Sequence, residues 1–194
     1  MIMSTHLGIA AAIQKYAEEK LSVKLDTVGF YYGNIKPDIC PRLTKVLHVK
    51  EHSFDFAKQE IKRLMELKPD SPVRYTRQFS EEIGIILHYI ADYFSYPHSK
   101  HFKGSLFSHY VHEVDLSAYC WINSKRIKAQ SYLDQAVVFT DHKALCNYIE
   151  ESYNDYMIKK SCHELELSFA LRACASVCLS IANTRMQIRE KLAA

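Results

Sequence analysis

Two pairs of ionisable side chains lie four residues apart, each in a largely apolar segment. His88 and Asp92 form the first pair, in HYIAD, and His109 and Glu113 form the second, in HYVHE. Residues four apart in a helix lie one turn above each other on the same face. Because burying an unpaired carboxylate is costly, such a pair in a buried helix indicates a partner or a metal ion opposite it. Imidazole and carboxylate ligands, with no required thiolate, suit zinc in a catalytic site.

Further side chains of the same types precede and separate these pairs. His98 follows Pro97 between the two pairs, and the N-terminal part supplies the remaining candidates. Helical bundles build multinuclear metal sites from such pairs on facing helices. The expected metal ligands are His6, Asp38, His52, His88, Asp92, His98, His109 and Glu113.

Each of these residues also has a simpler interpretation. His88 and Asp92 alone would be a structural histidine–carboxylate pair in a core, and His6 alone would be an exposed terminal residue. His112 is an alternative ligand to His109, but the four-residue step to Glu113 favours His109. The other histidines are expected to be surface or supporting groups; they are His48, His101, His142 and His163.

The composition indicates an average globular protein. The 194 residues are 48% hydrophobic, which is enough for one domain with a sizeable core, over residues 1–194. The net charge of +3 and the absence of a basic stripe do not favour a nucleic-acid partner. No run was found that is long and apolar enough to span a membrane.

The N-terminal segment does not have the pattern of a signal peptide, because no basic region precedes its apolar run and Lys15 interrupts that run early. The six cysteines form no CxxC pair and are expected to be free thiols. A cytoplasmic location is therefore expected. Composition does not determine the oligomeric state.

The distribution of Gly and Pro predicts an all-α fold. From Ser105 to Ala194 the sequence contains neither residue, which favours helices joined by short polar turns. Alternating strand patterns are absent, so a single-domain bundle of about seven helices is expected. NIKPDICPR and KPDSP are expected to be a loop and a turn. The expected helices cover about 4–20, 26–33, 53–67, 73–94, 104–122, 142–160 and 164–191, with a possible break in the fifth.

The helix that carries the first pair is apolar on nearly all sides. In IGIILHYIADYF, residues 83–94, the only ionisable groups besides tyrosine are His88 and Asp92. A helix that is apolar all round is buried. His88 and Asp92 are therefore expected to point into the interior of the bundle.

The order of the candidate ligands resembles the zinc-dependent phospholipase C family, whose fold is shared with the single-strand-specific zinc nucleases. The family pattern runs H…D…H…HxxxD…H…HxxxE. The matching segments, in order, are STHLGIAAAI, GNIKPD, EHSFDF, HYIAD, PHS and HYVHE. The match spans His6 to Glu113, and eight ligands in order make it specific.

The resemblance implies two or three zinc ions per chain. One zinc would be held by Asp38, His52, His88 and Asp92, and a second by His98, His109 and Glu113. The third would be held by His6 and would share Asp92 as a bridge. In the family, a terminal tryptophan completes the third site with its amino group and carbonyl, whereas this sequence has Met1.

The resemblance also implies phosphodiester hydrolysis of phospholipase C type, in which metal-bound hydroxide attacks phosphorus. Zinc lowers the pKa of bound water to near 7. The carboxylate of Asp38 is a candidate general base. The expected substrate is a phosphodiester, with phospholipid as one class. The alternatives are a zinc nuclease or phosphomonoesterase on the same fold, and a non-catalytic zinc-binding helical protein.

Overall fold

Helices account for nearly all of the regular structure. The computed structural model describes residues 1–67, 76–122 and 129–193, with side chains to residue 188. In these residues the chain forms eight α-helices, one short 3₁₀ helix (η1) and no strand, which confirms the all-α prediction with one helix more than expected. The helices are α1 (Met3–Leu21), α2 (Thr27–Ile39), α3 (Lys50–Glu66), α4 (Arg77–Tyr93), η1 (Tyr96–His98), α5 (Leu106–Ile122), α6 (Ala129–Leu133), α7 (His142–Met157) and α8 (His163–Ala193).

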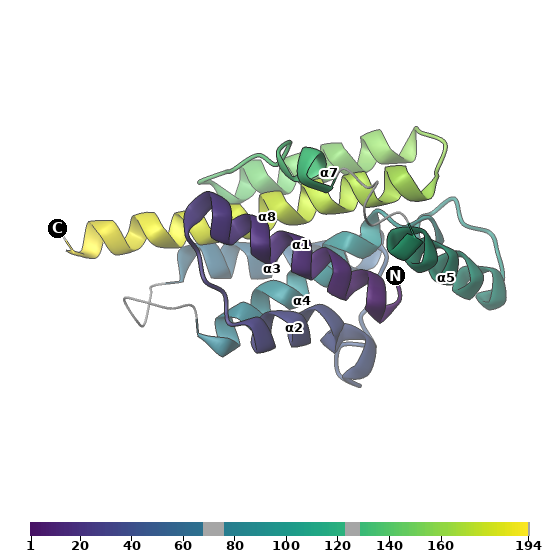
Figure 1. Cartoon of the computed structure of the whole chain (residues 1–194), viewed down its shortest axis with the longest axis horizontal. Coiled ribbons are helices and arrows are strands. Elements are labelled where there is room, and N and C mark those ends of the chain that lie inside the picture. The colour runs from purple at the N-terminus through teal and green to yellow at the C-terminus, as the bar shows by residue number, and fades with distance from the viewer. Residues whose placement is uncertain (68–75, 123–128, 194) are drawn as a thin grey trace.

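The long helix α8 organises the bundle. It runs along the long axis of the molecule, and α1, α3, α4, α6 and α7 all pack against it (Figure 1). Two of its residues, Cys174 and Cys178, are fully buried in the core. All six cysteines are free thiols.

Helix α8 also corrects one expectation from the sequence. The segment His163–Ile188 is long and apolar enough to cross a membrane by length and composition, whereas no such run was expected. However, 83% of its most apolar window is buried inside the structure. A core helix passes the same test, so the segment is weak evidence for a membrane span.

Helices α2 and α4 approach each other unusually closely because glycines line their contact. A Cβ atom added to Gly33 would lie 2.1 Å from the carbonyl oxygen of Glu81, and one added to Gly84 would lie 2.5 Å from that of Phe30. The two backbones therefore touch where any side chain would separate them. This contact fixes the end of α2 beside the middle of α4.

The same contact explains why the expected loop at residues 34–42 is only partly a loop. Helix α2 continues to Ile39 and includes Pro37, although proline normally ends a helix. Tertiary packing routinely overrides local preference, and α2 packs against α4 over this stretch. As a result, Asp38 lies on the last turn of a helix.

Other boundaries differ by a few residues. Helix α3 begins at Lys50, three residues earlier than expected, and the Ser53 hydroxyl donates to the Val49 carbonyl at 3.0 Å. Helix α4 is capped by Thr76, which accepts from the backbone N–H of Phe79 at 3.2 Å. Helix α5 is a single helix with no break, and α6 was not expected. The predicted turn KPDSP lies outside the described residues.

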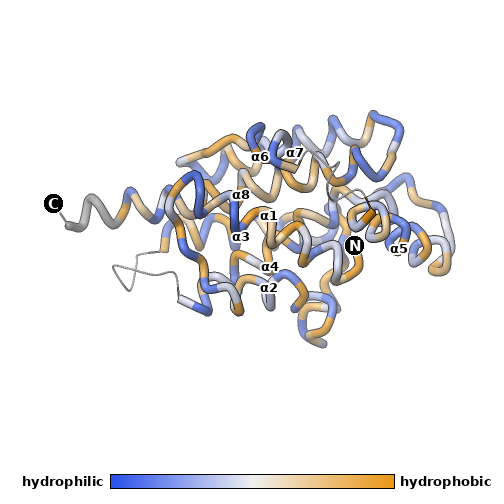
Figure 2. Tube along the Cα trace, in the orientation of Figure 1, coloured by the Kyte–Doolittle hydropathy of each residue, from blue (hydrophilic) through white to orange (hydrophobic). Residues whose placement is uncertain are grey.

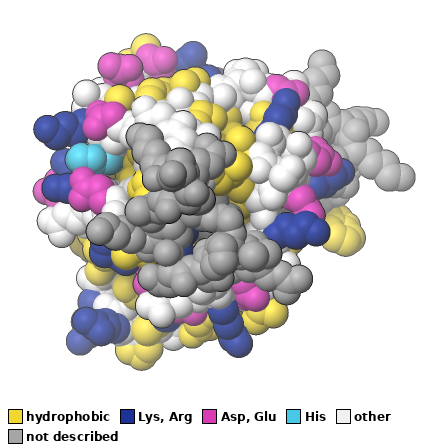
Figure 3. Space-filling view, turned by 90° about the vertical axis from the view of Figure 1, so that its left-hand side faces the viewer, with side chains coloured by type: hydrophobic (Ala, Val, Ile, Leu, Met, Phe, Trp, Pro, Cys, Tyr) yellow, Lys and Arg dark blue, Asp and Glu magenta, His cyan; other side chains and the backbone are white. Residues whose placement is uncertain are grey.

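Helix α5 lies at one end of the molecule, apart from the main bundle (Figure 1). It contacts α1 and η1, and of its side chains Glu113 and Leu116 are buried. Even so, hydrophobic residues recur along it (Figure 2). At the opposite end, where α8 leaves the bundle, basic and acidic side chains are interspersed (Figure 3).

Candidate metal centre

Asp92 lies at the centre of a cluster of histidines and carboxylates. Helix α4 places Asp92 and His88 on one face, and both side chains are fully buried. Asp92 Oδ1 lies 3.3 Å from His6 Nε2. The other oxygen, Oδ2, lies 3.0 Å from His48 Nδ1 and 3.3 Å from His88 Nε2. The two oxygens of one carboxylate thus face two different sets of donors, as a bridging ligand requires.

The first set of donors consists of Asp38, His48 and His88 together with Asp92 Oδ2. Asp38 Oδ1 lies 3.4 Å from His88 Nε2 and 3.7 Å from His48 Nδ1. Asp38 comes from the last turn of α2, His48 from the segment between α2 and α3, and His88 from α4. One ion between these atoms would have four ligands, as zinc prefers.

The second set consists of His98, His109 and Glu113. The Nε2 atoms of His98 and His109 lie 2.9 and 3.0 Å from Glu113 Oε1. The 3₁₀ helix η1 supplies the first residue and α5 supplies the other two. His112, the alternative to His109, faces Glu166 instead, at 3.0 Å.

The third set lies on the inner side of Asp92. His6 of α1 is fully buried, and its ring stacks on that of His88 with 3.9 Å between centroids. The Met1 amino group is in contact with Asp92 Oδ1 and lies 2.9 Å from Glu113 Oε1. An amino group therefore lies in this part of the cluster, although the residue is not tryptophan.

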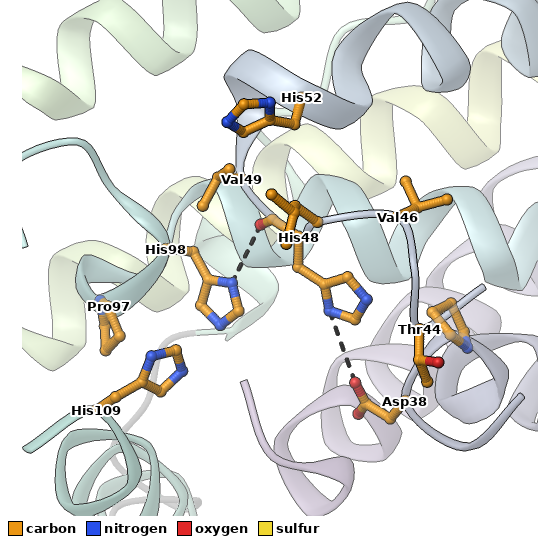
Figure 4. Close-up of a pocket in the computed structure, with 11 residues that line it drawn as sticks. Asp38, Thr44, Val46, His48, Val49, His52, Pro97, His98 and His109 are labelled. Carbon is orange, nitrogen blue, oxygen red and sulfur yellow. Dashed lines mark hydrogen bonds and ion pairs between the residues drawn. The ribbon is translucent and has the colours of Figure 1, made fainter. Parts of the chain in front are cut away.

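One expected ligand lies outside the cluster in the structure. Seven of the eight candidate residues come together, but His52 does not, and His48 lies beside Asp38 and His88 in its place. Because α3 begins at Lys50, His52 falls in its first turn and is exposed. Figure 4 shows His48 directed at Asp38, with His52 apart from both.

Backbone carbonyls hold two of the imidazoles in the orientation that metal binding needs. His88 Nδ1 donates to the Asn34 carbonyl at 2.8 Å, and His98 Nδ1 donates to the His48 carbonyl at 3.1 Å. A carbonyl oxygen only accepts, so Nδ1 carries the proton and Nε2 is free to bind a metal. In both residues Nε2 points to the cluster.

Burial and charge set the protonation states of the cluster. Burial and the neighbouring His88 lower the pKa of His6 to about 3, and burial also lowers the pKa of His98. Burial would raise the pKa of Asp92, but His98, the Met1 amino group and His6 outweigh it and hold that pKa well below its usual value. Neutral imidazoles and an ionised carboxylate are the forms that bind metal.

The pKa values of two other carboxylates, Glu113 and Asp38, are shifted in opposite directions. Burial would raise the pKa of Glu113, but the neighbouring His109 and His98 side chains and the Met1 amino group outweigh it, so the pKa is lowered. For Asp38, burial prevails and raises the pKa.

The buried polar atoms of the cluster fit a metal ion. Among the described residues, neither ring nitrogen of His6 has a hydrogen-bond partner, and Asp92 Oδ2 has none either, although His48 is close. Each unsatisfied buried group costs about 1–3 kcal/mol. Ions between the three sets would satisfy His6 Nε2 and Asp92 Oδ2, and these nitrogen and oxygen donors are ones that zinc accepts.

A cleft of about 490 Å³ opens beside the cluster (Figure 4). Asp38, His48, His98 and His109 face it from the two outer sets of donors, whereas His6 does not line it. Its apolar walls are formed by Pro37, Val46, Leu47, Val49 and Pro97. A small charged group can therefore reach the outer donors while an apolar part lies against the walls.

Comparison with known proteins agrees with this geometry. The sequence model for zinc-dependent phospholipase C matches residues 5–162, which includes every residue of the cluster except Met1. No curated protein and no solved structure matches the chain.

Proposed function

Because this chain belongs to the zinc-dependent phospholipase C family, we propose that it hydrolyses the phosphodiester of a phospholipid on two or three zinc ions held by the metal centre. The observation that carries the proposal is the position of Asp92, whose two oxygens face separate donor sets beside an open cleft. A structural zinc site needs one ion with four protein ligands. A centre with three sets of donors and an open side instead fits catalysis.

Zinc ions in such a centre neutralise phosphate charge and lower the pKa of bound water. The protein's contribution is to orient the donors and to exclude solvent. His88 and His98 are fixed by backbone carbonyls, and Asp92 is completely buried. Electrostatic stabilisation is strongest in such a preorganised, dry environment.

Asp38 is the carboxylate that we assign as the general base. Its side chain is 27% exposed, compared with 0% for Asp92 and 11% for Glu113. It also lines the cleft, which neither of the other two does. Of these three carboxylates, Asp38 is therefore the one that a group in the cleft can touch.

Two further observations favour phospholipid over nucleic acid. Leu106 and Phe107 are 90% and 75% exposed on α5, the helix that also carries His109 and Glu113. An apolar surface next to the centre suits a lipid bilayer or micelle. Net charge is only +3, and nucleic-acid binding normally needs clustered basic residues.

The test is hydrolysis of phosphatidylcholine vesicles and of a soluble nitrophenyl phosphocholine, with and without a chelator. We expect both substrates to be cleaved, activity to be lost on chelation, and zinc to restore it. Asp38→Asn should lower kcat by about 10²–10⁴-fold with a smaller change in KM. Cleavage of single-stranded nucleic acid but of neither choline ester would favour a nuclease, and no activity in zinc-loaded protein would favour a non-catalytic role.

The surface of α5 is tested with the same two substrates. Leu106→Ser combined with Phe107→Ser should lower activity on vesicles while leaving the soluble substrate unaffected. Ile158→Ser is the matched control, because Ile158 is 83% exposed but lies outside α5. An equal loss on both substrates would mean that the pair acts on the centre and not on the lipid surface.

A further inference from the structure

Beyond the metal centre, α5 and α8 bring together a fourth group of potential metal ligands. His112 comes from α5, and His163 and Glu166 come from the first turn of α8. One ligand atom from each lies within 4.8 Å of the others. None of the three belongs to the sets of donors around Asp92.

The distances in this group are those of a compact site. His112 Nε2 lies 3.0 Å from both carboxylate oxygens of Glu166. The rings of His112 and His163 have centroids 5.0 Å apart. In a tetrahedral zinc site with bonds of 2.0–2.1 Å, neighbouring ligand atoms are about 3.3 Å apart. Small side-chain movements would therefore admit an ion.

Burial makes the group costly without a further partner. Glu166 is fully buried, and its ion pair is with His112, which is charged only when protonated. His163 Nδ1 is buried and has no hydrogen-bond partner among the described residues. A buried carboxylate with no permanent positive charge beside it and an unsatisfied imidazole nitrogen are both unfavourable. A divalent cation would neutralise the carboxylate and bind the nitrogen.

We propose that His112, His163 and Glu166 bind an additional zinc ion, with an open position for water. Two imidazoles and one carboxylate are a known ligand set for zinc. The Ser161 hydroxyl donates to Glu166 Oε1 at 2.6 Å and orients the carboxylate from outside the site. His163 and Glu166 lie beyond residues 5–162, the part that the family model matches.

The position of this site would let it link two helices. Helix α5 packs on α1 and η1, and an ion shared by His112 and the first turn of α8 would add a direct link from α5 to α8. His109 and Glu113 lie on the same helix as His112. The additional ion therefore holds in place the helix that supplies two ligands of the metal centre.

The test counts zinc in purified full-length protein after dialysis against micromolar zinc. Wild type should hold one equivalent more than His163→Ala and one more than Glu166→Gln, which keeps the shape of the side chain. His142→Ala is the matched control, because His142 is also the first residue of a helix and, among the described residues, forms ion pairs with two carboxylates, Glu66 and Asp141. It should bind as much zinc as wild type.

A variant could also lose zinc from the metal centre, so that its zinc content falls by more than one equivalent. Anomalous diffraction at the zinc edge, measured on wild-type crystals, locates the additional ion directly in that case. A peak between the three side chains is expected. Equal zinc contents in wild type and both variants, or no peak there when the metal centre is filled, would overturn the proposal and leave a His112–Glu166 ion pair. Neither result depends on whether the protein hydrolyses a phosphodiester.

Discussion

At the scale of single residues, the position of His48 is the feature with the clearest consequence. His48 Nδ1 lies within 4 Å of both Asp38 and Asp92, whereas exposed His52 lies outside the cluster. His48→Ala should therefore lose about one zinc equivalent. Activity should fall by at least about 10²-fold, because removing a direct metal ligand costs more than removing a group that hydrogen-bonds to a ligand.

His52→Ala is the natural control for this change. His52 lines the same cleft and lies four residues after His48 in the sequence. The variant should retain its zinc. Zinc content by elemental analysis distinguishes the two variants. Loss of zinc from His52→Ala alone would mean that the metal-bound protein rearranges this segment.

The difference between His48 and His52 also shows what the sequence could and could not predict. His88 and Asp92 were placed correctly in the interior, because both lie on one helix and their relative orientation follows from its period. The choice between His48 and His52 depends on where α3 begins relative to α4, which is a non-local property. The family pattern specifies a histidine in this region, but two are present in the sequence.

At the scale of elements, the glycine contact between α2 and α4 positions Asp38 against His88. Gly33→Ala would place a methyl group against the Glu81 carbonyl, so the helices must separate. We expect a loss of about 1–3 kcal/mol of stability, and weaker zinc binding because Asp38 moves with the end of α2.

Gly8→Ala provides the comparison, because a Cβ atom there meets nothing within 4 Å and Gly8 lies inside α1. Alanine favours helix over glycine by about 1 kcal/mol, so this variant should be slightly more stable than wild type. Thermal unfolding with a zinc titration measures both effects. If Gly33→Ala behaved like Gly8→Ala, the close contact would not be what positions Asp38.

The sequence predicted the existence of most helices but not this contact. The sequence predicts that Pro37 lies in a loop, since proline usually ends a helix. The continuation of α2 depends on glycines facing a second helix, and a single sequence does not show which surfaces will meet. For the same reason, the exposed position of α5 could not be predicted from its apolar composition.

At the scale of the whole molecule, the buried cluster makes the stability of the metal-free protein depend on pH. The pKa of His6 falls from 6.5 to about 3 on folding, so between these values the unfolded chain binds a proton that the folded chain does not. The lowered pKa values of His98, Asp92 and Glu113 act in the same direction. The raised pKa of Asp38 acts in the opposite direction, but the two imidazoles dominate between about pH 7 and about pH 5, so the free energy of unfolding should decrease as pH falls below about 6.5.

Thermal unfolding in chelator at about pH 7 and about pH 5 tests this prediction. The midpoint should be lower at the acidic pH, and zinc should raise it at both, since a ligand that binds only the folded state stabilises it. The rise in the unfolding midpoint on adding zinc should be smaller at the acidic pH, because protons compete with zinc for the imidazoles. A midpoint that rises on acidification would contradict the assigned protonation states.

The shallow packing of α5 has a kinetic consequence. His6, His88 and Asp92 have no exposed surface, so an ion can reach the inner donors only if part of the structure moves. Helix α5 buries just Glu113 and Leu116 among its described side chains, so it can be lifted at low cost. Uptake of the innermost ion should then reach a limiting rate at high zinc concentration, set by the opening of α5. In stopped-flow measurements, a rate that stays proportional to zinc concentration would instead indicate entry through the cleft without opening.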